Sequence, residues 1–200
     1  MKYFLYLLLI VGVVSCIPTK KEKHSETYQI GQIITEKGEM LFWLSDETPL
    51  HKASFLKLAE EKFWDSLTFN RVIKDFVIQG GCPDTPLGFN DSPYLIEPEF
   101  RDHLKHVYGA VGAGRDGNPE KFSAGCQLYI VHNREGLPRL DGDYMIFGQV
   151  FKGFDVLDAI ANVETDSIDQ PLIPITMKVN VLELTAAELS TMDFDANDIR

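Results

Sequence analysis

The most informative segment of this sequence runs Phe69-Asn70-Arg71-Val72-Ile73-Lys74-Asp75-Phe76-Val77-Ile78-Gln79-Gly80-Gly81. Most of its side chains are large and apolar, and Arg71 and Gln79 stand among them. A guanidinium is costly to bury unless it has polar partners or a function. Residues two apart share a face of an extended chain, so Phe69, Arg71 and Ile73 are expected to point the same way. The pair Gly80-Gly81 then predicts a sharp turn, because glycine adopts backbone conformations that other residues resist.

The composition fits one ordinary globular domain. The chain has 200 residues, of which 44% are hydrophobic, and this is sufficient for a buried core. Its formal net charge of -11 argues against nucleic-acid binding, which usually requires a basic face. Asp102, His103 and His106 lie close together, but no second group of ligands has the spacing of a metal site. No metal site is therefore expected.

The N-terminus has the pattern of an export signal. An apolar run from Tyr3 to Val14 follows Lys2 and is too short to span a bilayer as a stable helix. Its end, Val13-Val14-Ser15-Cys16, resembles the lipobox of bacterial lipoproteins. This resemblance implies removal of residues 1–15 and acylation of Cys16, with residues 16–26 as a polar tether to the membrane. Simple secretion, or an uncleaved anchor with a chance cysteine, is the alternative.

Local patterns in the rest of the chain predict mostly strands. The expected elements are a hairpin over residues 27–34 and 39–44, a helix from Thr48 to about Phe63, a helix over 153–160 and a closing strand over 173–184. Lys37-Gly38 separates the two arms of the hairpin, and Pro49 suits the first turn of the first helix.

Two further features concern the cysteines and the C-terminus. Cys82 and Cys126 either pair or stay free, because neither the number nor the spacing of the cysteines decides between these states. Residues 185–200 are acidic, and their Asp193-x-Asp195-x-Asn197 spacing resembles part of a calcium loop. The glycine and the final glutamate of such a loop are missing, so we expect a solvated acidic tail.

The segment quoted first resembles the signature of the cyclophilins, Phe-His-Arg-Val-Ile-x-x-Phe-x-Ile-Gln-Gly-Gly, with Asn70 in place of the histidine. Further segments resemble the family in the same order; they are residues 94–100, 109–115, 123–131 and 140–150. The resemblance covers about Thr27 to Leu184. It implies that residues 27–184 form a mainly β domain: a closed, antiparallel eight-stranded β-barrel capped by two α-helices.

The resemblance also implies peptidyl-prolyl cis-trans isomerase activity, which needs no cofactor. Rotation about the bond before proline returns a lone pair to the prolyl nitrogen, and a guanidinium can stabilise that state. Arg71 is the expected catalytic residue, and Gln79 is expected to orient it and to hold substrate backbone. The residues implied to bind substrate are Phe76, Val77, Tyr129 and Leu140 around the proline ring, Tyr144 at its edge, and Gly114 and Arg115 through main-chain groups beside the residue that precedes proline.

Some positions depart from the family pattern. Arg139 stands where many eukaryotic members carry tryptophan, and Tyr144 stands where they carry histidine. Ala113 and Gly114 replace the methionine and alanine that usually precede the arginine of that strand. Activity is expected to survive these changes with an altered preference for neighbouring side chains.

The sequence therefore predicts a monomeric isomerase that acts on proline-containing segments of exported polypeptides. It is expected in a bacterial cell envelope, anchored through Cys16 in the outer rather than the inner membrane, with its domain outside the cytoplasm. The alternative is a catalytically weak binding module or holdase for proline-containing segments. A third hypothesis is an accessory lipoprotein whose acidic tail docks a partner.

Overall fold

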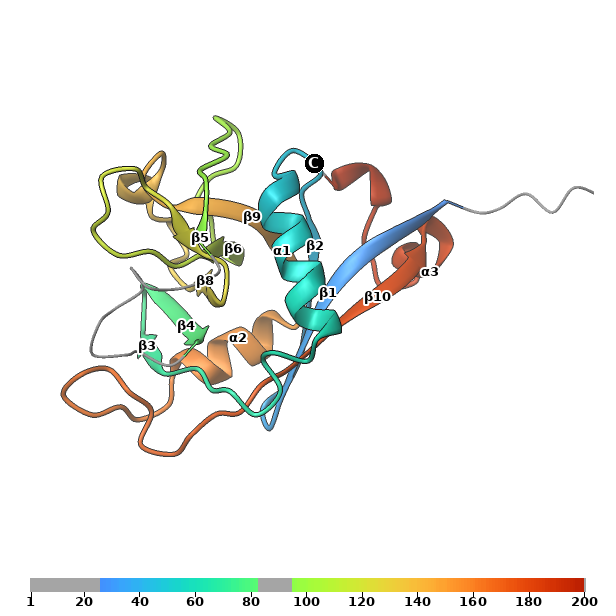
Figure 1. Cartoon of the computed structure of the whole chain (residues 1–200). Coiled ribbons are helices and arrows are strands. Elements are labelled where there is room, and N and C mark those ends of the chain that lie inside the picture. Colours follow the sequence, from blue (N-terminus) through green and yellow to red (C-terminus); the bar gives the residue numbers. More distant parts are fainter. Residues whose placement is uncertain (1–25, 83–94, 200) are drawn as a thin grey trace, which may run out of the picture.

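The structure is a computed structural model that describes residues 26–82 and 95–199 (Figure 1). The predicted signal peptide and Cys16 lie outside these residues, as does nearly all of the predicted tether. The strands are β1 (Thr27–Thr35), β2 (Gly38–Leu44), β3 (Arg71–Ile73), β4 (Val77–Gly81), β5 (Leu95–Ile96), β6 (Ala110–Ala113), β7 (Ser123–Ala124), β8 (Gln127–Val131), β9 (Met145–Lys152) and β10 (Lys178–Thr185). The helices are α1 (Pro49–Glu60), α2 (Phe154–Ala161) and α3 (Ala186–Ser190), with short 3₁₀ turns at Pro138–Leu140 and Ala196–Asp198. No helix in this described part of the chain is long and apolar enough to cross a membrane.

Eight of the strands form one antiparallel sheet in the order β10-β1-β2-β9-β6-β8-β4-β3, while β5 and β7 pair separately. The segments that precede the two edge strands also pair with each other. The Phe69 amide donates to the Ile175 carbonyl at 3.0 Å, and the Met177 amide donates to the Leu67 carbonyl at 2.8 Å. These bonds draw the two edges of the sheet together. The predicted mainly β fold with an eight-stranded antiparallel sheet is confirmed.

The helices cover the sheet and complete the main core. Helix α1 packs against β10, and α2 packs against β2, β3 and β4 (Figure 1). Alternate residues of each strand point into this core because side chains alternate between the faces of a sheet. Phe42, Phe55 and Trp64 are among its largest fully buried side chains.

The N-terminus of α1 is capped by a residue distant in sequence. Pro49 lies in the first turn as predicted, but Thr48 makes no side-chain capping bond. Instead, the Glu99 carboxylate accepts the amides of Leu50 at 3.1 Å and His51 at 3.0 Å, and lies 2.7 Å from Nδ1 of His51. The first amides of a helix lack partners within the helix, and a carboxylate placed there also meets the positive end of the helix dipole. The helix ends at Glu60, slightly before the predicted Phe63.

The glycine pair of the signature segment does not make the predicted turn. The chain reverses instead between β3 and β4 at Asp75, whose φ is 58°. Gly80 and Gly81 both belong to β4. A Cβ on Gly80 would overlap the Thr68 carbonyl, and a Cβ on Gly81 would overlap the carbonyl of Cys126. These glycines therefore permit close backbone packing, while the turn is made within the segment Lys74-Asp75-Phe76.

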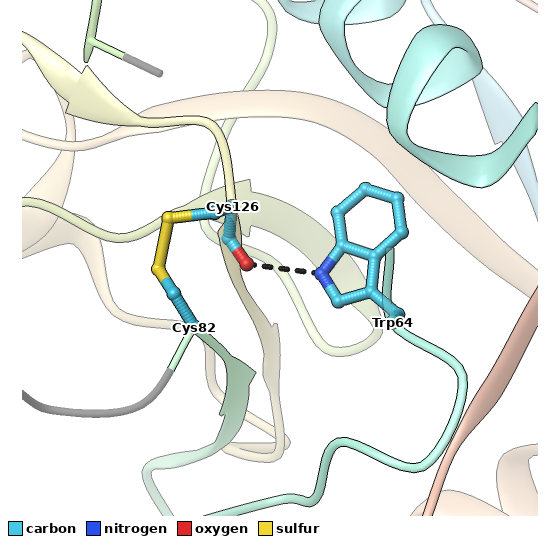
Figure 2. Close-up of a disulfide and its surroundings, with 3 residues drawn as sticks. All are labelled: Trp64, Cys82 and Cys126. Atoms are coloured by element: carbon cyan, nitrogen blue, oxygen red, sulfur yellow. Dashed lines mark hydrogen bonds between the residues drawn. A yellow bond between two sulfur atoms is a disulfide. The ribbon is translucent and has the colours of Figure 1, made fainter. Parts of the chain in front are cut away.

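Cys82 and Cys126 form a disulfide, which the sequence had left open (Figure 2). Their Cα atoms lie 5.3 Å apart, and 44 residues separate them in the chain. The bond joins the end of β4 to the start of β8. The indole Nε1 of Trp64 donates to the Cys126 carbonyl at 2.9 Å, as Figure 2 shows. The disulfide therefore holds together two strands that also pair along their length.

The C-terminal segment packs on the sheet, so the prediction of a solvated acidic tail is wrong for residues 185–199. Thr185 and Glu188 form a reciprocal capping box at the start of α3. Leu189 is fully buried, and the Phe194 ring stacks on Phe151 with centroids 4.2 Å apart. The acidic side chains face outward, and the apolar side chains between them anchor the segment beside β10 (Figure 1).

Candidate active site

The strand register places the central polar residues in one row. Arg71 on β3 is opposite Gln79 on β4, Gln79 is opposite Tyr129 on β8, and Tyr129 is opposite Gly112 on β6. Directly opposite residues lie close enough for their side chains to interact. The row therefore brings together residues from four strands that are far apart in sequence.

All nine residues predicted to act on substrate line a single pocket of about 150 Å³. They are Arg71, Phe76, Val77, Gln79, Gly114, Arg115, Tyr129, Leu140 and Tyr144. Phe76, Val77, Tyr129, Leu140 and Tyr144 belong to a hydrophobic cluster separate from the main core. The pocket thus has apolar walls with two guanidinium groups, and no acidic side chain lines it. Asn70, which departs from the family signature, does not line it either.

Arg71 is held by two neighbours within the pocket. Its Nη1 donates to Oε1 of Gln79 at 3.2 Å, and its Cζ lies 5.8 Å from the centroid of the Phe76 ring. The side chain is half-buried, so one part of the guanidinium is fixed while the rest can reach a ligand. The predicted orienting contact from Gln79 is therefore present.

A chain of hydrogen bonds through Tyr129, His106 and Asp141, here called the relay, holds Tyr129 in place. The Tyr129 hydroxyl lies 2.8 Å from Nε2 of His106, and Nδ1 of His106 lies 2.8 Å from Oδ1 of Asp141. The same carboxylate oxygen accepts the His106 amide at 3.0 Å. The hydroxyl also lies 3.3 Å from the Met145 carbonyl. The relay directs the polar end of the tyrosine away from the pocket and leaves its ring as the wall.

The electrostatics of the relay define its protonation state. Burial is the main cause that lowers the pKa of His106, and Asp141 offsets this only in part. Partial burial opposes ionisation of Asp141, but the hydrogen bonds from His106 outweigh it and lower the pKa of Asp141. Burial raises the pKa of Tyr129 well above its usual value. Since an ionised carboxylate only accepts hydrogen bonds, neutral His106 donates from Nδ1 to Asp141 and accepts a hydrogen bond from the Tyr129 hydroxyl at Nε2.

Small residues make room in the pocket walls. A Cβ on Gly112 would overlap the Tyr129 ring, so glycine is required opposite this tyrosine. Gly114 donates its amide to the Gln127 carbonyl at 2.8 Å, and its own carbonyl accepts the Ala124 amide at 2.7 Å. The predicted main-chain contact of Gly114 with substrate therefore has to compete with these bonds. The main-chain groups of Arg115 have no such partner among the described residues.

Comparison with known proteins agrees with this arrangement. The family model described as cyclophilin type peptidyl-prolyl cis-trans isomerase/CLD matches residues 30–181. The chain belongs to this family. The cyclophilin family and the enzyme class predicted from the sequence, peptidyl-prolyl cis-trans isomerase, are confirmed.

Individual cyclophilins support the assignment along most of the domain. The chain is 38% identical to peptidyl-prolyl cis-trans isomerase B of Bacillus subtilis over 135 residues, which cover 66% of this chain and 90% of that protein. A cyclophilin type isomerase of Cryptosporidium parvum has a similar crystal structure, with a TM-score of 0.68 and 26% identity, covering 80% of this chain and 99% of that one. The same parasite protein was also solved in the presence of the dipeptide Ala-Pro, with a TM-score of 0.67, 26% identity, and coverage of 78% of this chain and 99% of that one.

Sequence reasoning missed the residues behind this cyclophilin pocket. On sequence alone, His106 was considered only as a metal ligand, and Asp141 lay within the family-like segment 140–150 without a role of its own. His106 precedes β6 in a segment without a recognisable pattern, and 23 residues separate it from Tyr129. A buried tyrosine requires a hydrogen-bond partner for its hydroxyl. This requirement was the one indication in the sequence that a polar residue such as His106 lies beside Tyr129.

Proposed function

We propose that Arg71 catalyses isomerisation of Xaa-Pro bonds by stabilising the twisted amide. The planar bond rotates over a barrier of about 20 kcal/mol because resonance gives it partial double-bond character. At the twisted state the prolyl nitrogen is pyramidal and carries a lone pair that can accept a hydrogen bond. An N–H of Arg71 donated to this nitrogen binds the twisted state more strongly than the planar one, and such differential binding lowers the barrier.

The apolar walls hold the proline ring in position for this step. Phe76, Val77, Leu140 and the ring of Tyr129 surround a pocket whose volume of about 150 Å³ suits one small ring. Because the ring is held, rotation moves the residue that precedes proline. We place that residue beside Gly114 and Arg115, with the free main-chain groups of Arg115 as its partners.

The observation that carries this proposal is the contact between Arg71 and Gln79, at 3.2 Å, on the rim of an apolar pocket. A guanidinium is always charged and has rigid donors, so one N–H can bind Gln79 while others face the substrate. A preorganised donor of this kind stabilises a transition state without rearranging during the reaction.

The test compares cis-trans exchange of a proline peptide with the purified protein and its Arg71→Ala and Arg71→Lys variants. Loss of one preorganised donor is expected to lower kcat/KM about 100-fold. Lysine should not restore it, since a single ammonium cannot bind Gln79 and substrate with the same fork geometry. Arg101→Ala, which removes an arginine outside the pocket, is the control, and circular dichroism checks that each variant is folded.

The alternative is a binding module that holds proline segments without isomerising them. It is favoured by Asn70, Ala113 and Gly114, which depart from the family pattern, and of these Gly114 lines the pocket. The same experiment separates the two functions. A folded wild-type protein that binds the peptide without accelerating exchange would establish the binding module, and equal rates for wild type and Arg71→Ala would remove Arg71 from the mechanism.

We also propose that the protein is a lipoprotein of a bacterial cell envelope that acts on exported polypeptides. The lipobox-like end at Cys16 supports export, and so does the Cys82–Cys126 disulfide, since disulfides persist mainly outside the reducing cytosol. Labelling of cells with a radioactive fatty acid should mark the wild-type protein and place it in the membrane fraction. Cys16→Ser should abolish the label, and a label retained by this variant would contradict the proposal.

A further inference from the structure

The arginines around the pocket share an unusual lack of acidic partners. Arg71 contacts Gln79 and the Phe76 ring. Arg115 donates to backbone carbonyls, among them that of Asp143 at 2.6 Å. Arg139 lies at the pocket edge, with its Cζ 4.8 Å from the centroid of the same Phe76 ring. None of these arginines forms an ion pair with a carboxylate of the described residues.

The other arginines in the described chain differ in this respect. Arg101 lies 3.9 Å from a carboxylate oxygen of Glu47, and Arg134 lies 2.6 Å from one of Asp158. The chain has 30 acidic and 19 basic residues, so acidic partners are plentiful elsewhere on the molecule. Their absence at the pocket is therefore specific to this site.

The carboxylates that follow Leu140 in the pocket wall do not fill this role. Asp141 lies 3.5 Å from Nζ of Lys105 and is also bonded to His106. Asp143 lies 2.7 Å from Nζ of Lys121. Each is already paired with a lysine. Lys121 is the main cause that lowers the pKa of Asp143, and the charge of Arg115 lowers it further. We therefore base the case for an unpaired cation on Arg139 alone.

Arg139 is the arginine of this group that is most available to a ligand. Its side chain is exposed, and it has no ion pair or hydrogen bond among the described residues. Arg71 is committed to the prolyl nitrogen in the proposed mechanism, and Arg115 is tied to carbonyls. The Arg139 guanidinium lies over the Phe76 ring, and the edge of a guanidinium can bind both oxygens of a carboxylate.

We infer that the pocket prefers Xaa-Pro segments with an acidic side chain directly after proline, and that Arg139 recognises this carboxylate. The inference rests on the proposed function. In that binding mode the residue before proline lies beside Gly114 and Arg115, and Arg115 stacks on Tyr144 with its Cζ 4.7 Å from the ring centroid. Arg139 stacks on a different ring, Phe76, next to Leu140. Arg139 therefore lies on the side where, in this binding mode, we expect the chain to leave the proline.

The test measures cis-trans exchange by NMR in blocked peptides Ala-Ala-Pro-Glu and Ala-Ala-Pro-Gln with catalytic amounts of the purified protein. The two peptides differ in one charge and have the same shape. Exposed ion pairs are weak, so the ratio of kcat/KM for the Glu and Gln peptides is expected to be about three at low salt. It should approach one at about 0.5 M salt, where charges are screened within a few ångströms.

Variants identify the residue responsible. Arg139→Gln should reduce the Glu/Gln ratio to about one, and Arg139→Glu should reverse it. Arg134→Gln is the matched control, because Arg134 also stacks on an aromatic ring, with its Cζ 3.8 Å from the Tyr108 centroid, but is neutralised by Asp158. This variant should keep the wild-type ratio.

The possible failures are distinguishable. Equal acceleration of both peptides by wild type at low salt overturns the inference and leaves the isomerase mechanism intact. If the Arg139→Gln variant still prefers the Glu peptide, another cation binds the glutamate carboxylate, and the assignment of Arg139 is overturned. No acceleration of either peptide overturns the proposed mechanism itself, and the inference with it.

Discussion

The hydroxyl of Tyr129 lies 2.8 Å from Nε2 of His106, on the side of the tyrosine ring that faces away from the pocket. The rings of these residues are nearly parallel, with an interplanar angle of 8° and centroids 6.0 Å apart. His106 in turn is bonded to Asp141, the residue that follows Leu140 in the pocket wall. The relay thus connects the Tyr129 wall of the pocket to the segment that carries the Leu140 wall, through buried His106 and half-buried Asp141.

Removing two members of this relay together should cost less than the sum of the two separate losses. Tyr129→Phe leaves Nε2 of His106 buried without a donor, and an unsatisfied buried group costs about 1–3 kcal/mol. Tyr129→Phe combined with His106→Leu replaces the contact by an apolar pair, so the double variant should be more stable than the sum of the single changes predicts. Urea unfolding of the four proteins measures this coupling. Strictly additive losses would show that the two side chains act independently.

The same substitutions should affect catalysis through the position of the tyrosine ring. We expect His106→Leu to raise KM more than it lowers kcat, because the relay supports the wall that binds the proline ring and not the donor of Arg71. In the Tyr129→Phe background, His106→Leu should have little further effect on KM. An equal effect of His106→Leu in both backgrounds would contradict a positioning role through Tyr129.

The stability of the protein should fall in acid through Glu99 and His51. Burial opposes ionisation of Glu99, but hydrogen bonds from His51 and the helix amides outweigh it and lower the pKa of Glu99. Burial lowers the pKa of His51 despite its bond to Glu99. Groups with lowered pKa values stabilise the fold above their usual pKa values, and this contribution is lost as the pH falls. The losses should begin below about pH 6.5 for His51 and below about pH 4.3 for Glu99.

Glu99→Gln tests the second of these contributions. At pH 7 the variant should lose about 1–2 kcal/mol of unfolding free energy, because the α1 amides lose a charged cap. The difference from wild type should begin to shrink below about pH 4.3 and should shrink further as the pH falls through the lowered pKa of Glu99. Denaturant unfolding at several pH values measures the difference, and a gap that stays constant down to low pH would contradict the assignment.

The disulfide should contribute strongly to stability because it closes a long segment of chain. For a separation of 44 residues, the loop-entropy relation gives about 4 kcal/mol. A Cys82→Ser/Cys126→Ser variant should therefore unfold at lower denaturant concentration than the oxidised wild type. A reducing agent should bring the wild type close to the variant and leave the variant unchanged. Equal midpoints for the oxidised wild type and the variant would contradict this contribution.

The C-terminal segment should stabilise the domain although it lies beyond the family match, which ends at residue 181. Leu189→Ala should cost about 2–4 kcal/mol, because the leucine is fully buried between α3 and the sheet. Asp198→Ala, in the same segment but exposed, should change the stability by less than about 0.5 kcal/mol. Thermal unfolding of both variants measures these losses. A Leu189→Ala variant as stable as wild type would mean that the segment contributes no stability, as expected of a solvated tail.

Patterns within short windows were sufficient to predict the fold and the front of the pocket. The order of apolar residues around Arg71 and Gln79, and the motifs that carry Tyr129 and Leu140, indicated a family whose architecture brings these residues together. The same local patterns gave a wrong prediction where one sequence feature is compatible with two structures. The pair Gly80-Gly81 suits either a turn or close packing, and only the neighbouring carbonyls of Thr68 and Cys126 distinguish these uses.

The motifs and their order indicated the family, and the resemblance to that family in turn implied the eight-stranded sheet and the residues that line the pocket. Periodicity, turn residues and motif order depend on residues that are near one another in the sequence, so they can be recognised without the structure. Only the tertiary structure shows that His106 supports Tyr129, that Glu99 caps α1 and that Cys82 bonds to Cys126. It also shows that Arg139 forms no ion pair with an acidic side chain of residues 26–82 and 95–199. Each of these depends on strand register and on the path of distant segments, because a contact forms only where folding brings two side chains within bonding distance.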